Sequence, residues 1–412
     1  MIILIMISIL RYTDIKRWKH SGRWVLVYGR RKTGKSYFVR NHVRWDRYYF
    51  VGRAGEILAG DETIGYETFV REVFQALERG ETVVVDEFQR LPGDFLDRVH
   101  AYGVRGRLIL VSSTLWLSRT FTAENSPLLG LFSEFKMTLI DERDILVNLA
   151  RHIHDPWELM ETAVFLREPW LVPVWEENRD IKSSLPFFTK FTVPALVGEI
   201  FMEEERSYSR VYEGILKAVA DGKSVSGEIA SWLFANHLIP ANNPSLVHPY
   251  LNVLVKIGLL EKIKIRGKRK FHYIHSSPVM DLYYYMDAKY CISEREISPE
   301  QVKKVLKIKI PHYVEHFVRR FLSGIYGLWG EKIVERDHEI DVALTDFNSL
   351  KAVVEVKWRR DFRLDPVLAK LRRYNCRKIL VVPDKTLMYK QPKDIEILDV
   401  ADLVNLAKQT IT

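Results

Sequence analysis

The sequence predicts an α/β protein of several domains whose first domain is a parallel sheet covered by helices. Two motifs and one pattern predict it. An apolar strand over residues 24–28 runs into Gly29-x-x-x-x-Gly34-Lys35-Ser36, and a second apolar strand over residues 82–86 ends in Asp86 and Glu87. Between and beyond these motifs, strand-like and helix-like segments alternate, which is typical of a parallel sheet with helices on both faces.

The glycine motif has the spacing of a phosphate-binding loop. Gly29 lets the chain leave the strand in a backbone conformation that a Cβ disfavours, and Gly34 lets backbone N–H groups approach phosphate oxygens. Lys35 is expected on the β- and γ-phosphates, and Ser36 is expected to give its hydroxyl to Mg²⁺. The nucleotide-contacting residues predicted here are Gly29, Arg30, Arg31, Lys32, Thr33, Gly34, Lys35, Ser36 and Tyr37.

The two acids at the end of the second strand are candidate catalytic residues. Asp86 is expected to hold Mg²⁺ through water and Glu87 to polarise the attacking water. Adjacent acids after a strand can also be a plain helix N-terminus. A third apolar strand, over residues 107–114, ends in serines, so Ser112 or Ser113 is expected to face the γ-phosphate, with an ordinary turn as the alternative. Of the two, Ser112 is taken as the candidate nucleotide contact.

Composition limits the classes of protein that fit. The chain has 412 residues, 47% of them hydrophobic, a formal charge of +9 and only two cysteines. The charge permits a polyanionic partner. The two cysteines argue against a disulfide framework or a zinc site and fit a reducing cytoplasm. Residues 1–10 are apolar but too few to span a bilayer, so we expect a packed segment and no membrane role.

The remaining elements of the first domain, residues 1–150, follow from local periodicity. Residues 11–23 predict a basic helix, and residues 67–79 place apolar side chains at helical spacing. The predicted helices cover 11–23, 37–44, 67–79 and 93–102, and a further strand covers 47–51.

Residues 151–206 predict a helical lid in which Pro169, Pro173, Pro186 and Pro194 break the elements. Residues 207–290 predict a winged helix: helices at 212–220, 226–234 and 245–257, then a hairpin of strands 258–265 and 271–274 around the basic turn 266–270. The third helix would enter a DNA groove and the basic turn would contact phosphate. The third helix is only thinly basic, so packing against neighbouring domains is the alternative.

Residues 291–412 predict a second α/β domain with a candidate metal centre. A helix over 311–326 carries Glu315, and neighbouring apolar strands carry Asp341 and Glu355 at their centres, with Lys357 on the same face as Glu355. Carboxylates in apolar strands need a partner. Asp341 and Glu355 would hold Mg²⁺ beside a scissile phosphate, and Lys357 would lower the pKa of the attacking water. A buried structural Lys–Glu cluster is the alternative.

At these residues the chain resembles the archaeal ATPase family in the STAND branch of the AAA+ proteins. The resemblance covers nearly the whole chain and is carried by the stretches Tyr28–Ser36, Val85–Gln89, Leu110–Ser113, Ile215–Gly222, Glu339–Asp341 and Val354–Trp358. It implies a phosphate-loop ATPase domain, a helical lid, a winged helix and a C-terminal domain of the PD-(D/E)xK nuclease type, that is, a restriction-endonuclease-like domain.

Two departures from that family matter. The family often has Pro-Leu-Tyr-Gly-Arg after the third strand, where this chain has Pro127-Leu-Leu-Gly-Leu131, so an arginine for the γ-phosphate is missing there. Arg119 or Arg143 could substitute. The Gly-Gly-x-Pro-like turn of the lid is altered around Trp170–Pro173. Slow hydrolysis, or use of ATP to hold and switch a conformation, is therefore favoured.

The sequence as a whole predicts a cytoplasmic Mg²⁺-dependent ATPase whose nucleotide state controls a winged-helix and nuclease-like module. ATP or ADP and Mg²⁺ are the expected ligands, double-stranded DNA is the expected macromolecular partner, and self-association into a homo-oligomer stays open. Two alternatives also stay open: a Mg²⁺-dependent DNA nuclease as the main activity, and a nucleotide-gated scaffold without turnover. The sequence identifies neither a DNA target nor a pathway.

Overall fold

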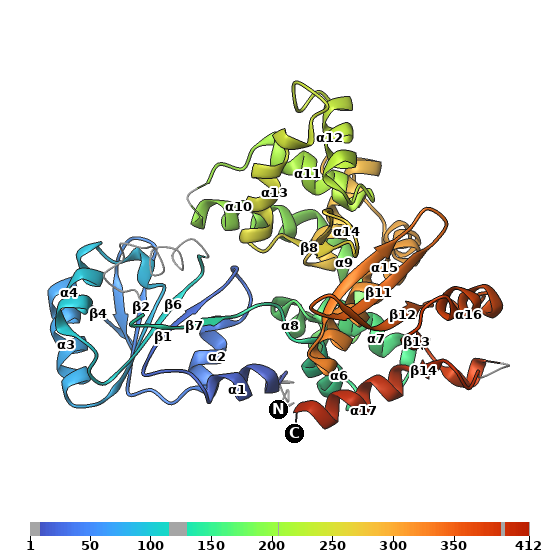
Figure 1. The fold of residues 1–412 in the computed structure, drawn as a ribbon. Coiled ribbons are helices and arrows are strands. Elements are labelled where there is room, and N and C mark those ends of the chain that lie inside the picture. The colour runs from blue at the N-terminus through green and yellow to red at the C-terminus, as the bar shows by residue number, and fades with distance from the viewer. Residues whose placement is uncertain (1–8, 115–129, 205, 389–391, 412) are drawn as a thin grey trace. The chain divides into compact units, whose positions relative to one another are not determined.

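The computed structural model describes residues 9–114, 130–204, 206–388 and 392–411 (Figure 1). Contacts group the chain into two compact units. Tyr12–Leu139 together with Leu196–Ser207 form the first, here called the N-terminal unit, and the rest of the described chain forms the C-terminal unit. The division into four domains stays a prediction; the contacts add that the end of the predicted lid groups with the phosphate-loop segment.

The N-terminal unit is built on a seven-stranded sheet in the order β4-β3-β2-β5-β6-β1-β7. Strands β2, β5, β6, β1 and β7 are parallel, and β3 and β4 add an antiparallel hairpin at one edge. The strands are β1 (Trp24–Tyr28), β2 (Arg47–Val51), β3 (Ile57–Ala59), β4 (Glu62–Ile64), β5 (Thr82–Asp86), β6 (Arg107–Ser112) and β7 (Ser133–Lys136). The sequence predicted β1, β2 and β5 at these bounds but not β3, β4 or β7.

Helices cover both faces of this sheet (Figure 1). On one face α3 and α4 bury residues such as Phe69 and Phe95 against Leu26 and Leu108. On the other, Trp18 and Phe38 pack on Val27 and Val111. The helices are α1 (Tyr12–Trp18), α2 (Lys35–His42), α3 (Tyr66–Glu78) and α4 (Asp94–Tyr102). Because both faces of the sheet are covered, successive residues of β1, β5 and β6 are buried, which explains why these strands read as continuous apolar runs.

The C-terminal unit begins with a helical layer, as the sequence predicted for residues 151–206. Its helices are α6 (Glu142–Leu149), α7 (Pro156–Leu166), α8 (Val172–Asn178), α9 (Ile181–Phe187) and α10 (Val193–Glu203), the last ending in the N-terminal unit. Pro169 and Pro173 lie in first turns, where the missing N–H costs little, whereas Pro186 and Pro194 lie inside the continuous helical run Ile181–Glu203. The stretch Ile181–Glu203 is long and apolar enough for a membrane span by length and composition alone, which is weak evidence.

Three helices and a hairpin follow, in the predicted order. They are α11 (Arg210–Ala220), α12 (Ser226–Ala235), α13 (His248–Lys256), β8 (Leu260–Lys264) and β9 (Phe271–His275). Their apolar sides meet inside the group, where Ile215, Leu233, Leu251 and Leu254 are fully buried.

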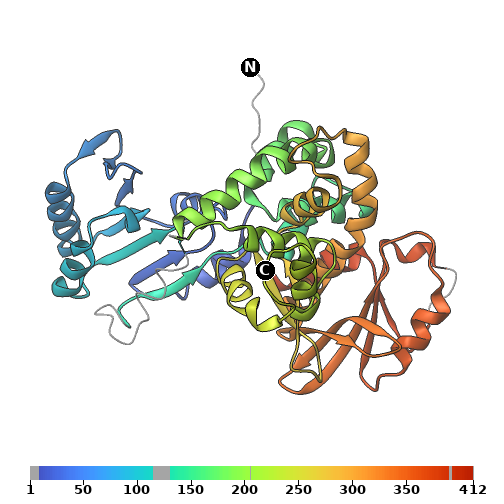
Figure 2. The same cartoon turned by 90° about the horizontal axis from the view of Figure 1, so that it is seen from above.

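The chain ends in a five-stranded sheet of order β10-β11-β12-β13-β14, whose strands are orange to red in Figure 2. The pairs β10–β11 and β11–β12 are antiparallel, and β12–β13 and β13–β14 are parallel. The elements are α14 (Pro278–Tyr290), α15 (Pro299–Tyr326), β10 (Trp329–Val334), β11 (Glu339–Asp346), β12 (Ser349–Val356), α16 (Leu364–Arg372), β13 (Arg377–Val381), β14 (Glu396–Leu398) and α17 (Val400–Ile411). Helix α16 covers one face through Leu368 and Leu371.

Two expectations about this last segment were wrong. The helix predicted to begin at Pro311 begins at Pro299, because Ser298 and Gln301 form a capping box there and Pro299 occupies the first turn. Asp341 and Glu355 do not lie at the centres of their strands. Asp341 is near the start of β11 and Glu355 near the end of β12, so both stand at the same end of the sheet.

Candidate functional sites

The phosphate-binding loop of the N-terminal unit connects β1 to α2, and its two glycines are required by different constraints. Gly34 has φ 87°, in the left-handed region. A Cβ on Gly29 would lie 2.0 Å from the Met137 carbonyl oxygen, because the chain after β7 runs hard against the end of β1 and the Met137 amide donates to the Tyr28 carbonyl at 2.7 Å. Gly29 is therefore fixed by close packing of two backbones.

Lys35 is buried inside this loop. Its Nζ donates to the carbonyl oxygens of Gly29 at 2.9 Å and Arg30 at 3.1 Å, and Thr33 donates to the same Arg30 carbonyl at 2.8 Å. Burial lowers the pKa of Lys35 to about 8, although the nearby carboxylates of Glu87, Glu203 and Asp86 oppose the shift. The loop thus holds an ammonium group whose hydrogen bonds to backbone carbonyls could be replaced by bonds to an anion.

Asp86, at the end of β5, is fully buried and close to the loop. Tyr48 donates a hydrogen bond to its Oδ2, and the Ser36 hydroxyl also hydrogen-bonds its carboxylate. Burial raises the pKa of Asp86, while the bonds from Tyr48 and Ser36 oppose the rise. The structure therefore brings Ser36 and Asp86, the two predicted magnesium ligands of this site, into contact.

Glu87 follows in a conformation that costs energy for a residue with a side chain, with φ 58° and ψ 36°. Its Oε2 accepts hydrogen bonds from Ser113 Oγ at 2.8 Å and Gln89 Nε2 at 2.5 Å. Ser112, the serine chosen from the sequence, is buried and pairs with Thr114 at 3.1 Å instead. Of the two serines considered, Ser113 contacts the candidate catalytic acid, because alternate residues of β6 point to opposite sides of the sheet.

A charged cluster beside the loop was not predicted. Arg31 pairs with Glu199 at 2.6 Å and with Glu203, and Arg90 lies 3.6 Å from Glu87 and 3.9 Å from Glu203. Arg53 also reaches Glu199, at 3.1 Å. The two glutamates are one turn apart on α10, a spacing that could have signalled a common acidic face. Two carboxylates of α10 therefore form ion pairs with arginines beside the phosphate-binding loop.

The other predicted loop residues vary in exposure. Arg30 and Thr33 are buried, Lys32 has φ 65°, and Tyr37 is 45% exposed. Of the arginines considered as substitutes for the missing family arginine, Arg119 and the first part of the Pro127–Leu131 segment lie outside the described residues. Arg143 lies in the C-terminal unit and already pairs with Asp141 at 2.8 Å, so its guanidinium has its own carboxylate. Arg90 is the arginine that the structure adds near Glu87.

In the C-terminal unit, Glu315, Asp341, Glu355 and Lys357 form what we call the C-terminal centre. Lys357 Nζ lies 2.8 Å from Glu355 and 3.8 Å from Asp341, and Asp341 Oδ2 accepts from the Val356 amide at 2.8 Å. Burial raises the pKa of Asp341 to about 7, and the neighbouring charges of Glu315 and Glu355 add to the rise. The four predicted side chains therefore share one electrostatic environment.

Lys370, which sequence reasoning missed, changes the reading of this centre. Its Nζ lies 2.5 Å from Glu355 Oε1 while Lys357 holds Oε2, so both oxygens of the fully buried Glu355 carry a lysine. In the described part of the chain, no group of three or more His, Cys, Asp or Glu side chains is placed to hold a metal ion. A divalent ion at Asp341 and Glu355 would have to displace a lysine from Glu355, so the structural-cluster alternative stays open.

The basic turn of hairpin β8–β9 is largely engaged within the protein. Arg266 donates to the Asn348 carbonyl at 2.7 Å and lies 3.6 Å from Glu331, and Lys268 donates to the Val334 carbonyl. Arg266 and Lys268 of this turn thus have partners within the protein, in the β11–β12 turn and on β10, and contact of the turn with DNA phosphate stays a prediction. Arg269 and Lys270 of the same turn are exposed.

Comparisons with known proteins agree with the N-terminal fold. No family model matches the chain. An uncharacterized protein of Methanocaldococcus jannaschii is 22% identical over 382 residues, covering 82% of this chain and 83% of that protein. A Walker-type ATPase of Pyrococcus abyssi is similar in structure, with TM-score 0.51 and 20% identity over 67% of this chain and 96% of that one. The Aeropyrum pernix ORC1 protein, solved in complex with DNA, gives TM-score 0.33 at 13% identity over 69% of this chain and 94% of its own. The Pyrococcus likeness supports a mixed α/β fold with a parallel-sheet core of the Walker-ATPase kind.

Proposed function

We propose that the N-terminal unit binds Mg²⁺-ATP and hydrolyses it. The observation that carries this proposal is the convergence of Lys35, Ser36, Asp86 and Glu87 at the carboxyl ends of β1 and β5, with β6 between them. Ligands of open α/β sheets bind at this edge, where strand ends and helix N-termini meet.

Each side chain then has a task that its surroundings support. Lys35 would bind the β- and γ-phosphates in place of its two loop carbonyls. Ser36 and, through water, Asp86 would hold Mg²⁺, which neutralises phosphate charge. Glu87 would orient the attacking water, and the hydrogen bonds from Ser113 and Gln89 fix its carboxylate in one rotamer.

Arg31 and Arg90 explain how nucleotide binding would affect the protein. Both are held by Glu203, and the phosphates would compete with that carboxylate for the same cations. Exchange of Glu203 for phosphate would loosen the end of α10, the helix that runs between the two units in sequence. This supports a use of ATP in which binding switches a conformation and turnover is slow.

Phosphate release from Mg²⁺-ATP tests the proposal, measured on the wild type and on Glu87→Gln with and without double-stranded DNA. We expect release by the wild type, retained ATP binding by the variant, and release reduced at least about 100-fold, the scale of losing one general base. Glu62→Gln, an exposed glutamate of β4, is the matched control. Binding without release in the wild type would favour the nucleotide-gated scaffold. Equal release by wild type and Glu87→Gln would refute the role of Glu87.

The C-terminal unit supports a second candidate function, a metal-dependent nuclease acting on DNA that the N-terminal unit controls. The supporting observation is that Asp341, Glu355 and Lys357 meet at one end of the sheet, with Glu315 of α15 close enough to raise the pKa of Asp341. Mg²⁺ held by Asp341 and Glu355 would supply a Lewis acid for the scissile phosphate. The three helices and hairpin of residues 210–275 would be a winged helix beside it.

Plasmid nicking in Mg²⁺ or Mn²⁺ tests this candidate. Nicking that is lost in Asp341→Ala and retained in Asp346→Ala, an exposed aspartate at the other end of β11, would support it. Lys370→Met would separate the two readings of the centre. If Glu355 is a metal ligand, freeing one of its oxygens should strengthen metal binding. If the cluster is structural, the same change should lower the melting temperature and leave no nicking under any metal.

The remaining expectations belong to the same proposal. We propose that the protein acts in the cytoplasm, alternates between ATP and ADP forms, and meets double-stranded DNA through the C-terminal unit. Self-association into a homo-oligomer would be measured together with ATP turnover by light scattering, since an active site completed by a second copy would give a rate per chain that rises with protein concentration.

A further inference from the structure

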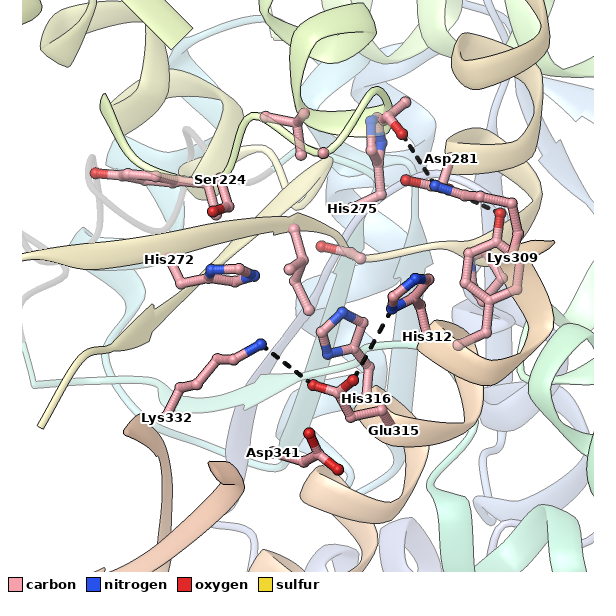
Figure 3. Close-up of a pocket in the computed structure, with 18 of the residues that line it drawn as sticks. Ser224, His272, His275, Asp281, Lys309, His312, Glu315, His316, Lys332 and Asp341 are labelled. Carbon is pink, nitrogen blue, oxygen red and sulfur yellow. Dashed lines mark hydrogen bonds and ion pairs between the residues drawn. The ribbon is translucent and has the colours of Figure 1, made fainter. Parts of the chain in front are cut away.

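The C-terminal unit contains a cavity of about 780 Å³ that the proposed function does not explain. Its walls come from hairpin β8–β9, helix α15 and strands β10 and β11, as Figure 3 shows. Glu315 and Asp341 of the C-terminal centre line one end. Asp281 and Lys309, paired at 2.6 Å, line the other. The cavity therefore extends well beyond the carboxylates of that centre.

The hairpin is a fixed wall of this cavity. The Arg266 amide donates to the Lys332 carbonyl at 2.9 Å, so the hairpin adds to the edge of β10. Arg319 and Arg320 of α15 both pair with Glu261 of β8, which ties the hairpin to the helix on the opposite wall. These contacts hold the two walls apart at a set distance, so the cavity is preformed.

The hairpin adds side chains to the end of the cavity lined by Glu315 and Asp341. These side chains belong to none of the motifs predicted for residues 291–412. His272 of β9 points into the cavity toward Lys332 and Glu315 (Figure 3). Lys270 of the turn also lines the cavity. The ring nitrogens of His272 and His316 carry no hydrogen bond within the described part of the chain, and burial lowers the pKa of His272 to about 4. Its imidazole is neutral near pH 7 and can accept or donate one hydrogen bond to a ligand.

The size of the cavity limits what it can hold. Pockets that enclose small molecules are about 300–1,000 Å³, and this cavity lies in that range. A DNA duplex keeps its bases stacked between two backbones, and enzymes that need one base in a pocket take it out of the stack. An unpaired nucleotide can enter such a cavity, whereas an intact duplex cannot.

We propose that this cavity binds one unpaired nucleotide of a single-stranded nucleic acid, with its phosphate at the Asp341 end, and that Lys270 and His272 of the hairpin form part of the binding site. The inference rests on the second proposed function and adds its substrate class. The lining offers groups that suit this ligand: Lys270 and Lys332 would attract phosphate, and Tyr285 offers an aromatic ring. The hairpin then serves the C-terminal centre rather than a duplex groove.

Binding of fluorescein-labelled oligonucleotides to the full chain tests the inference, followed by anisotropy in Ca²⁺ so that the readout does not depend on cleavage. The probes are a single strand, a blunt duplex of the same sequence, and a duplex with a single-stranded overhang. We expect the single strand and the overhang to bind at least about tenfold more tightly than the blunt duplex, and Lys270→Ala to weaken them about tenfold, the scale of one charge-assisted hydrogen bond. Arg269→Ala is the matched control, since Arg269 is exposed in the same turn but does not line the cavity.

His272→Gln, which keeps a hydrogen-bonding side chain on β9, gives a second variant, and circular dichroism checks that each variant is folded. A blunt duplex that binds as tightly as the single strand, or Lys270→Ala and His272→Gln that both bind like the wild type, would overturn the inference. Failure of the nuclease proposal looks different: single strands bind and Lys270→Ala weakens them, yet no nucleic acid is cut in Mg²⁺ or Mn²⁺.

Discussion

Lys35 is held inside its loop in a way that suits the proposed binding of phosphate. Its ammonium group is removed from water and held by two carbonyls of its own loop, with three carboxylates near enough to oppose the loss of its charge. A buried charge is costly unless it is paired or hydrogen-bonded, so a bound anion would stabilise this ammonium group. Replacing Lys35 by alanine should abolish tight ATP binding, which isothermal titration would measure; unchanged affinity would refute the site.

The lowered pKa of Lys35 predicts a pH dependence of ATP binding. Below pH 8 the lysine of the free protein is already charged, so affinity should be nearly constant. Above pH 8 the free lysine is increasingly neutral, and binding of the phosphates must restore its proton. The dissociation constant should therefore rise about tenfold per pH unit above 8, the slope expected for uptake of one proton. Lys35→Arg, whose side chain stays charged, should flatten the profile, and a flat wild-type profile up to pH 10 would contradict the prediction.

Asp341 predicts a pH dependence of stability. Its pKa is about 7 in the folded protein against 3.8 for an unperturbed aspartate, so the folded state binds the proton more tightly than the unfolded state. Ionisation of Asp341 therefore destabilises the folded state. The free energy of unfolding is unaffected below about pH 4 and falls as the pH rises through 7. Asp341→Asn removes this cost, so its gain in free energy of unfolding over wild type should be about 2–3 kcal/mol larger at pH 8 than at pH 5. Urea denaturation at both pH values measures it, and an equal gain at the two would argue against the shift.

Helix α10 and hairpin β8–β9 make contacts in the structure that their sequence patterns did not predict. The end of α10 was expected to be part of a helical lid, and it brings Glu199 and Glu203 to the arginines beside the phosphate-binding loop. The hairpin was expected to present a basic tip to DNA, and in the structure two side chains of that tip also bond within the protein, Arg266 to the Asn348 carbonyl and Lys268 to the Val334 carbonyl. In each case the contacts of the element are made with residues that lie far away in the sequence.

Glu203→Gln should tighten ATP binding, because it removes the carboxylate that competes with phosphate for Arg31 and Arg90. We expect a three- to tenfold gain in affinity, about the worth of a partly exposed ion pair. Met202→Gln, exposed on the neighbouring position of α10, is the control. Fluorescent ATP titration measures both variants. A loss of affinity in Glu203→Gln would instead mean that Glu203 positions Arg31 for the nucleotide.

At the scale of the whole molecule, one chain forms two units that have separate cores. The C-terminal unit is joined by a buried ion network in which Glu142 pairs with Arg167 at 2.9 Å, and Glu261 pairs with Arg319 and Arg320. The network joins α6, α7, β8 and α15, so the three-helix group and the C-terminal sheet share their stability. The N-terminal unit has its own core on both faces of its sheet.

Glu261→Gln should destabilise the C-terminal unit without affecting the N-terminal one. Glu261 is partly exposed, so removing its charge leaves two arginines with a weaker partner and should cost about 1–3 kcal/mol, less than for a fully buried pair. Differential scanning calorimetry should show one transition shifted downward, while ATP binding at low temperature stays as in wild type. Glu300→Gln, an exposed residue in the first turn of α15, is the control. A uniform shift of all transitions would mean that the two units unfold together.

The sequence by itself determined the features that are local in the chain. Continuous apolar runs placed β1, β2 and β5, and the spacing of two glycines, Lys35 and Ser36 predicted a loop whose glycine geometry the structure has. The three helices and hairpin of residues 210–275 also followed from periodicity. The capping box at Ser298 was equally local, and with it the helix from Pro299 could have been predicted in full.

Tertiary structure alone decided the contacts between residues far apart in sequence. Arg31 meets Glu203 across 172 residues, and Lys370 reaches Glu355 from a separate helix. The choice of Ser113 over Ser112 depends on which side of β6 faces Glu87, and the short strands β3, β4 and β7 are held by their neighbours rather than by their own propensity. Periodicity indicates which side of an element is buried. Which charged side chains that element meets depends on how distant segments pack, and no local pattern encodes it.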